Sequence, residues 1–196
     1  RPHTLVYGVQ SEGADAIVKS FAAKEKVVID RVNTIADGIA VKSPGDTPLS
    51  LINNYVDEMV TVSDNSIANA MFLIMERCKQ VAEPSGAAAL AAVLSGKIDV
   101  SGKKAVCLVS GGNIDMALVG KLVMRGMSAT HRIAAISCVI PSTPNDFNNL
   151  VNIVTSNGGN VNDVSFNITA SYIAPNQNSV YMEFEISGVQ QKEHIL

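Results

Sequence analysis

The chain has 196 residues, of which 47% are hydrophobic and 17% are charged, and its formal net charge is −3. This composition is typical of a globular protein and leaves room for one large domain or two small ones. A slightly acidic chain disfavours a nucleic-acid partner, and no apolar run approaches the roughly 18 residues that a membrane helix needs. We therefore expect neither a nucleic acid nor a membrane as partner.

The cysteines and histidines disfavour two further kinds of site. Cys78, Cys107 and Cys138 each lie in an apolar stretch, and an odd, scattered set does not form a disulfide framework. This usage indicates a reducing compartment, and we expect a cytoplasmic protein. The three histidines are too dispersed for a metal motif, so we expect no metal site. The chain opens at Arg1 without an initiator methionine, which indicates a piece cut from a longer protein.

The chain up to about residue 127 alternates short apolar runs with helical patterns. The run Leu5–Val9 predicts a strand, and a helical stretch follows over Glu12–Ala23. Residues 55–62 predict a second strand. Ser63 is then suited to cap a helix that has Asp64 in its first turn, where the helix dipole favours negative charge.

Two further helices and a strand complete this part. In the first helix, apolar side chains recur at the spacing of one helical face, at Ile67, Ala70, Met71, Ile74, Met75 and Cys78. The second helix starts at Pro84, is rich in alanine and ends before Gly96. The run Ala105–Val109 predicts another strand. This alternation favours an α/β fold with a mostly parallel sheet in a three-layer arrangement.

The pattern changes from about residue 131. Arg132–Ile140 predicts a strand, and Thr143 before Pro144 predicts the start of a helix. Two segments of strict apolar-polar alternation follow and predict strands with one buried face. Their apolar residues are Val164, Phe166, Ile168, Ala170 and Tyr172 in the first and Val180, Met182, Phe184 and Ile186 in the second. Gln190–Leu196 then begins a helix, so that residues 131–196 predict an α+β segment, the start of a ferredoxin-like β-α-β-β-α-β unit.

One turn stands out between the predicted strand at Ala105–Val109 and the helical pattern that starts near Met116. It reads Ser110-Gly111-Gly112-Asn113. A strand that ends in Ser-Gly-Gly and turns into a helix is a place where α/β enzymes hold a ligand. Alone, such a short motif is more often a plain turn.

Four motifs together resemble the threonine dehydratases, with the same order and similar spacing. They are Gly8-Val9-Gln10-Ser11, Thr34-Ile35-Ala36-Asp37-Gly38, Ala82-Glu83-Pro84-Ser85-Gly86-Ala87 and Ser110-Gly111-Gly112-Asn113-Ile114-Asp115. The resemblance covers most of residues 4–125. It implies a pyridoxal 5'-phosphate enzyme of fold type II, the tryptophan-synthase-β-like fold, with L-threonine and L-serine as substrates and β-elimination as the reaction.

The resemblance also implies a role for six residues at the cofactor. Ser110 would meet the pyridine nitrogen, and a neutral hydroxyl does not enforce ring protonation as a carboxylate would. The other residues are Gly111, Gly38 and Ala36, whose backbones would approach the cofactor, Glu83 near the ring, and Asn113, which would hold the turn or reach an effector. Glu83 has an alternative reading as a helix-start acid beside Pro84, favoured by the dipole.

The sequence departs from the family pattern at three places. The lysine that binds the cofactor and the phosphate cup precede the first matching strand in the family, so we expect them upstream of Arg1 and assign no catalytic residue. Gln10 and Ala16 stand where some eukaryotic relatives carry acidic metal ligands. The tail resembles an ACT regulatory domain, but Ser142-Thr143-Pro144-Asn145 stands where such domains often carry Asp-Arg-Pro-Gly.

These features predict residues 1–127 as the C-terminal part of a catalytic domain and residues 131–196 as an incomplete ACT-like domain. We expect a fragment of a threonine/serine dehydratase that is inactive alone, forms a homo-oligomer and responds to an amino-acid or nucleotide effector. One alternative is a serine racemase or another β-eliminating enzyme of the same fold. An alternative of another class is a regulatory module that dimerises and senses an amino acid or a nucleotide.

Overall fold

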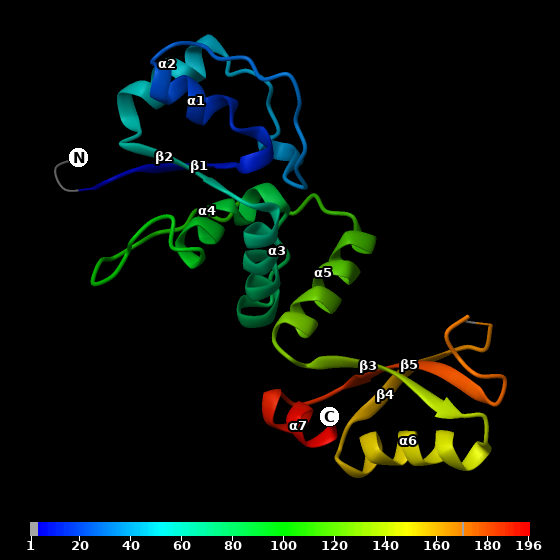
Figure 1. The fold of residues 1–196 in the computed structure, drawn as a ribbon. Coiled ribbons are helices and arrows are strands. Elements are labelled where there is room, and N and C mark those ends of the chain that lie inside the picture. The colour runs from blue at the N-terminus through cyan, green and yellow to red at the C-terminus, as the bar shows by residue number, and fades with distance from the viewer. Residues whose placement is uncertain (1–3, 170) are drawn as a thin grey trace. The chain divides into compact units, whose positions relative to one another are not determined.

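The computed structural model describes residues 4–169 and 171–196. The chain divides into two compact units, the first ending at Leu122 and the second spanning Val123–Leu196 (Figure 1). Helix α5, Met116–Ala129, carries the chain from one unit to the next. Ala170, which the alternation placed on a buried strand face, lies outside the described residues.

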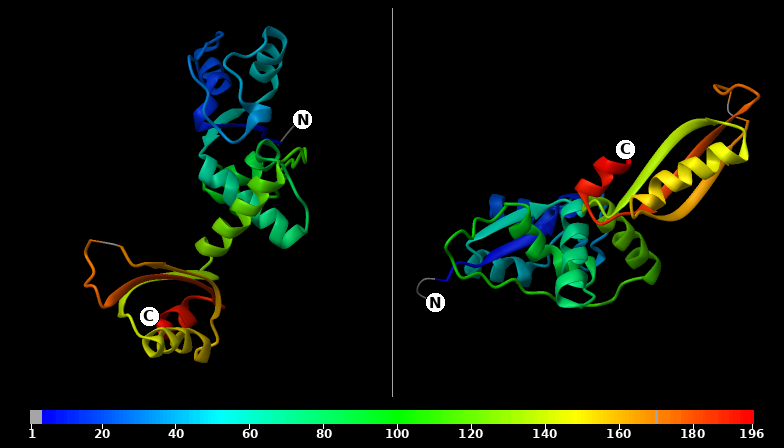
Figure 2. Two further views of the ribbon diagram at one scale, coloured as in Figure 1. Left: turned by 90° about the vertical axis from the view of Figure 1, so that its right-hand side faces the viewer. Right: turned by 90° about the horizontal axis from the view of Figure 1, so that it is seen from below.

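The first unit holds a parallel sheet of two strands. β1 (Tyr7–Ser11) pairs with β2 (Glu58–Val62), with Val9 opposite Val60, and the two lie side by side in Figure 2. Between them run a 3-10 turn, Glu12–Ala14, helix α1, Ala16–Ala23, a second 3-10 turn η2, Asp37–Ile39, and helix α2, Asp46–Tyr55. The predicted start of the second strand at Tyr55 is wrong, because the amide of Val56 still donates to the Ile52 carbonyl and the helix continues to Tyr55.

Two packed helices form the centre of this unit. Helix α3 (Asp64–Leu73) continues as a π turn, Ile74–Cys78, and helix α4 spans Pro84–Leu94. The predicted cap is confirmed, because Ser63 Oγ accepts from the Ser66 amide at 3.2 Å. The buried residues of the predicted α3 face, Ile67, Ala70, Met71 and Ile74, pack in one core with the small residues Ala87, Ala88, Ala91 and Ala92 of α4. Cys78 is exposed at the end of the π turn, where Lys79 takes a left-handed conformation.

The predicted strand at Ala105–Val109 is not formed. The segment is irregular, the side chain of Val106 is 97% exposed and that of Leu108 is 77% exposed. A strand requires a neighbour that pairs with its amides and carbonyls, and the described residues supply none beside this run. An apolar run predicts the tendency to pair, whereas the partner decides whether a strand forms.

The second unit has the order β-α-β-β-α that the sequence predicts. β3 (Ile133–Pro141) is followed by α6 (Pro144–Ser156), β4 (Asn160–Asn167), β5 (Gln177–Glu185) and α7 (Val189–Ile195). The strands form an antiparallel sheet in the order β3-β5-β4, and α6 crosses one of its faces (Figures 1 and 2). Thr143 caps α6 as expected, since its Oγ1 accepts from the Asp146 amide.

The core of the second unit lies between α6 and the sheet. Val180, Met182, Phe184 and Ile186 are all buried, which confirms the alternation predicted for the second segment. The alternation of the first segment extends too far, because β4 ends at Asn167 and Ile168 and Tyr172 are 70% and 71% exposed. The predicted fold class is confirmed as a mixed α/β arrangement with one parallel and one antiparallel sheet. In the described part of the chain, every helix is too short or too polar to cross a lipid bilayer.

We predict that Phe184→Ala destabilises the second unit by about 3–5 kcal/mol, because it leaves a cavity at a fully buried ring. Tyr181→Ala is the matched control, since it lies on the same strand with its side chain 40% exposed, and should cost less than about 1 kcal/mol. Urea unfolding of the whole chain, followed by circular dichroism, measures both. Equal midpoints for the two variants would contradict the register of β5.

Candidate functional site

Three segments that are distant in sequence meet at the carboxylate of Glu83, which precedes α4. The Glu83 amide donates to the Gly111 carbonyl at 3.2 Å. Gly111 has a φ of +72°, and a Cβ there would overlap the Glu83 carboxyl group. A Cβ at Gly38 would lie 2.8 Å from the Ser85 Oγ and 3.7 Å from Glu83 Oε1. Gly38, Glu83 and Gly111 therefore form a glycine-lined cradle around one carboxylate.

Ser110 is held at this cradle by a backbone contact. A Cβ at Gly86, in the first turn of α4, would overlap the backbone of Ser110. Gly86 is buried, whereas Ser110 remains exposed. Only glycine permits this approach of two backbones, and the contact sets Ser110 beside the N-terminus of α4.

Ala36 is placed by a network that the sequence analysis missed. Asp64, the first residue of α3, accepts hydrogen bonds from Thr34 Oγ1 at 2.6 Å, the Ile35 amide at 3.0 Å and Ser11 Oγ at 3.1 Å. The Ala36 amide in turn donates to Thr34 Oγ1, and Ala36 is fully buried. Asp64 thereby fixes the loop that leads to Gly38. Its sequence signal, an acid in the first turn of a helix, indicated only a favourable dipole contact.

Asn113 lies apart from the carboxylate cradle. It is exposed in a tight turn, in which the Ile114 amide donates to the Gly112 carbonyl at 3.0 Å. Asp115 then caps α5 through Oδ1 to the Ala117 amide at 2.9 Å. The geometry therefore gives Asn113 the turn-holding position rather than a place at Glu83.

The residues at the cradle fit a flat, polar aromatic ring. The glycines leave backbone surface open, Ser110 offers a neutral hydroxyl that can donate or accept, and Glu83 offers a carboxylate. Such a set can position a heteroaromatic ring without forcing a proton onto its nitrogen. The set contains no nucleophile or amine that could bond to a carbonyl cofactor, so chemistry on a substrate requires a group from elsewhere.

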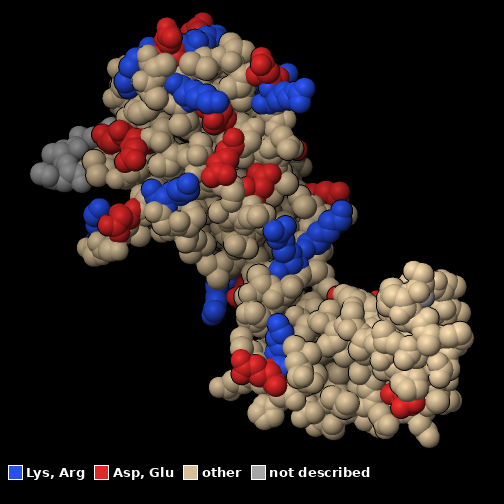
Figure 3. All heavy atoms as spheres, in the orientation of Figure 1, with Lys and Arg blue, Asp and Glu red and all other residues tan. Residues whose placement is uncertain are grey.

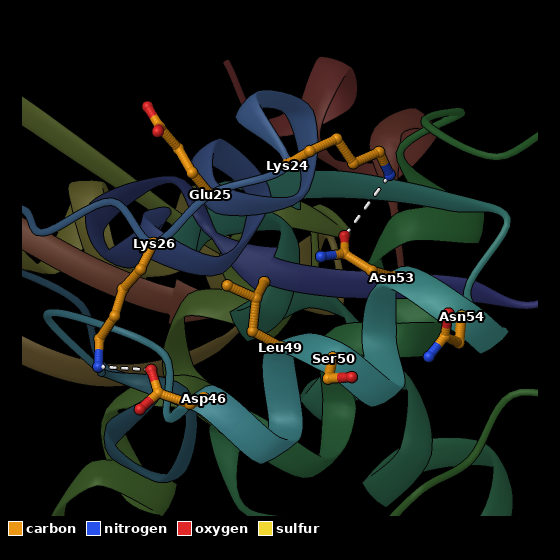
Figure 4. A pocket seen from close by; sticks show the side chains of 8 residues that line it. All are labelled: Lys24, Glu25, Lys26, Asp46, Leu49, Ser50, Asn53 and Asn54. Atoms are coloured by element: carbon orange, nitrogen blue, oxygen red, sulfur yellow. Dashed lines mark hydrogen bonds and ion pairs between the residues drawn. The ribbon is translucent and has the colours of Figure 1, made fainter.

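A second hollow, of about 410 Å³, lies between α2 and the segment after α1 (Figure 4). Lys26 forms an ion pair with Asp46 at 3.0 Å, and Lys24 Nζ donates to Asn53 Oδ1 at 3.5 Å. Lys24 also lies 3.8 Å above the ring of Phe21. Because these charges are exposed and engaged with each other, the hollow has the character of an ordinary polar surface.

Two groups have a shifted pKa, and neither lies in the cradle. Hydrogen bonds from the backbone and side chain of Ser101 lower the pKa of Asp99, and burial raises the pKa of the Cys138 thiol. Positive and negative side chains are interspersed over the first unit on the face shown in Figure 3. The described residues therefore show no acid or base tuned for proton transfer at the site.

The parallel strands, the helices around them and the glycine cradle define part of an α/β cofactor-binding protein. The family model described as "Pyridoxal-phosphate dependent enzyme" matches residues 1–111, and the chain belongs to this family. Pyridoxal phosphate is the cofactor of the family, so the sequence-based assignment of the family and its cofactor is confirmed.

The similar proteins specify the kind of enzyme. The L-threonine ammonia-lyase of Thermotoga maritima is 36% identical over 194 residues, which cover 99% of this chain and 48% of that protein. Among solved structures, the processed form of threonine deaminase isoform 2 from Solanum lycopersicum matches with a TM-score of 0.57 and 28% identity, over 63% of this chain and 34% of that one. Maize serine racemase matches with a TM-score of 0.56 and 32% identity, over 64% and 41%. The chain spans about half the length of the curated relatives that it matches over its whole length.

We predict that Gly111→Ala destabilises the first unit by about 1–3 kcal/mol, because the left-handed conformation is unfavourable for a residue with a Cβ and because that Cβ displaces Glu83. Gly112→Ala is the matched control, since its Cβ would have ordinary contact, 3.5 Å from the Val81 carbonyl. Urea unfolding measures the difference. Adding Glu83→Ala to Gly111→Ala should restore part of the loss, and no restoration would mean that the carboxylate does not occupy this place.

Proposed function

We propose that this chain supplies the ring-facing half of the active site of a pyridoxal-phosphate-dependent threonine/serine dehydratase. The reaction of the whole enzyme is conversion of L-threonine to 2-oxobutanoate and ammonia, and of L-serine to pyruvate and ammonia. The observation that carries the proposal is the convergence of three of the four family motifs on Glu83. The similarity to the Thermotoga maritima L-threonine ammonia-lyase over 194 residues supports the same activity.

Each residue of the cradle has a role in this proposal. The Ser110 hydroxyl contacts the pyridine nitrogen, and its backbone is fixed by Gly86. The backbone of Ala36–Gly38 lies against the cofactor edge and is held there by Asp64. Gly111 keeps the ring face open, and Glu83 lies between the two glycines. Bound pyridoxal phosphate supplies the electron sink that makes the α-proton of the amino acid removable.

The neutral contact at Ser110 favours elimination. A carboxylate at this place would keep the ring nitrogen protonated and strengthen electron withdrawal, whereas a hydroxyl leaves the nitrogen free to lose its proton. Weaker withdrawal shortens the life of the α-carbanion, so that loss of the β-hydroxyl competes well with other fates. The cofactor lysine and the phosphate cup belong to the part of the family domain upstream of the first matching strand, so the 196-residue chain is inactive alone.

For the second unit we propose an ACT-like regulatory domain at residues 131–196, following a catalytic part at residues 1–127. Its support is the β-α-β-β-α order and the similarity to the Thermotoga maritima relative, which continues through this unit. The domain binds an amino-acid or nucleotide effector and joins protomers into a homo-oligomer. The three free cysteines support a cytoplasmic location.

Serine racemase is a second candidate function on the same fold, and one observation favours it. Maize serine racemase is 32% identical to this chain over the matched part, whereas the Solanum lycopersicum threonine deaminase is 28% identical. A racemase returns the proton to the α-carbon, whereas a dehydratase loses the β-hydroxyl. Chiral analysis of recovered serine, beside keto-acid measurement, separates the two.

The proposed function is tested in a fusion, in which the part of the Thermotoga maritima enzyme before its matching segment is joined to this chain. We expect threonine-dependent 2-oxobutanoate from the fusion and none above background from the 196-residue chain alone. Ser110→Ala should lower kcat about 10- to 100-fold, because a contact that is strongest in the transition state is lost. Ser128→Ala, at an exposed position in α5, is the control and should leave kcat unchanged. A fully active Ser110→Ala fusion would remove Ser110 from the proposed role.

A further inference from the structure

A groove of about 800 Å³ opens along β1 on the first unit. One wall is the strand and the residues before it, the other is the irregular segment after α4, and α4 itself lines the groove between them. The lining side chains are mainly apolar, with Val9 from β1, Val93 from α4, Ile98, and the exposed Val106 and Leu108. The groove is thus bounded by two lengths of chain that both have a strand-forming sequence.

The backbones on the two walls lack partners that a sheet would provide. β1 pairs with β2 and with no other strand among the described residues. Within residues 4–169 and 171–196, the amides and carbonyls of residues 104–110 make no hydrogen bond to other backbone groups. Unpaired strand backbone beside exposed apolar side chains is a template for another strand.

The exposed apolar area beside these backbones is large for a free surface. Val106 is 97% exposed, Leu108 77% and Leu5 60%. Burying a valine or leucine side chain stabilises a protein by about 1.5–3 kcal/mol, so an occupant that covers these residues gains affinity as well as backbone hydrogen bonds. Lys103 and Lys104 also line the groove, beside Asp99, and they leave its charge mixed at one end.

We propose that this groove binds an extended apolar segment from the other half of the family's catalytic domain, which pairs with residues 104–110 as a β-strand. The family model matches this chain from residue 1 to residue 111, and the Thermotoga maritima relative is about twice as long as the segment it shares with this chain. The occupant therefore comes from the portion of the relatives that this chain does not represent. The inference rests on the proposed function, because it completes the same domain.

The test uses the full 196-residue chain and, as a separate polypeptide, the part of the Thermotoga maritima enzyme that precedes its matching segment. We expect a 1:1 complex in size-exclusion chromatography without added cofactor. Hydrogen exchange at residues 104–110 should slow on complex formation, since strand pairing protects amides and simple apolar contact does not. Val106→Asp should weaken the complex about 10- to 100-fold, because a charge would be buried without a partner.

Val28→Asp is the matched control. Val28 is 68% exposed and does not line the groove, so this variant should bind as tightly as the unmodified chain. Equal binding by Val106→Asp, absence of any complex, or complex formation without protection of residues 104–110 would each overturn the proposal. A dimer of the 196-residue chain alone that Val106→Asp abolishes would also overturn it, in favour of a second copy as the occupant.

The two proposals fail in different experiments. Docking is measured with separate polypeptides and no cofactor, whereas the proposed function is measured as keto-acid production by the covalent fusion. A tight complex together with an inactive fusion would leave the groove assigned and reject the dehydratase. An active fusion together with no complex would reject the groove as a docking site and leave the dehydratase in place.

Discussion

The candidate site depends on one contact, the close approach of the Ser110-Gly111 backbone to the first turn of α4. Gly86 has the Ser110 backbone where a Cβ would be, and the Glu83 amide donates to the Gly111 carbonyl. Any other residue at Gly86 would push the turn away from the helix, and Glu83 would lose its position against Gly111. The conformational freedom of glycine in the unfolded chain costs about 0.5–1 kcal/mol at each such position, and the packing that the contact permits offsets it.

The contact is effective because α4 is itself held firmly. Its buried alanines pack against α3, whose larger Ile67 and Met71 fill the shared core. At the start of α3, Asp64 accepts from Ser11 at the end of β1 and from Thr34 in the loop that leads to Gly38. Small residues allow the close packing of the two helices, and one carboxylate joins the strand, the loop and the helix. The four motifs of the sequence are therefore connected by a few short-range interactions of the folded chain.

Features with local causes could be predicted from the sequence. Ser63 and Thr143 cap their helices, and β5 buries alternate residues, because each depends on neighbours within a few positions. The irregular path of residues 105–109 could not be predicted, since strand formation requires a partner that no local pattern reveals. In the site, the motifs brought Gly38, Glu83 and Gly111 into view, and the structure shows why they meet. The role of Asp64 was missed because its partner Thr34 lies 30 residues away.

The groove and the cradle meet at one residue, and this links assembly to chemistry. Residues 104–110 line or border the groove and end at Ser110, whose backbone rests on Gly86. Among the described residues, the close backbone contact that holds this segment lies at its end, at the turn on α4. A strand paired along it would fix the rest of the segment and restrict how far Ser110 can move, which an oriented hydroxyl contact requires. Completion of the sheet and orientation of Ser110 are therefore one structural event, since the same segment takes part in both.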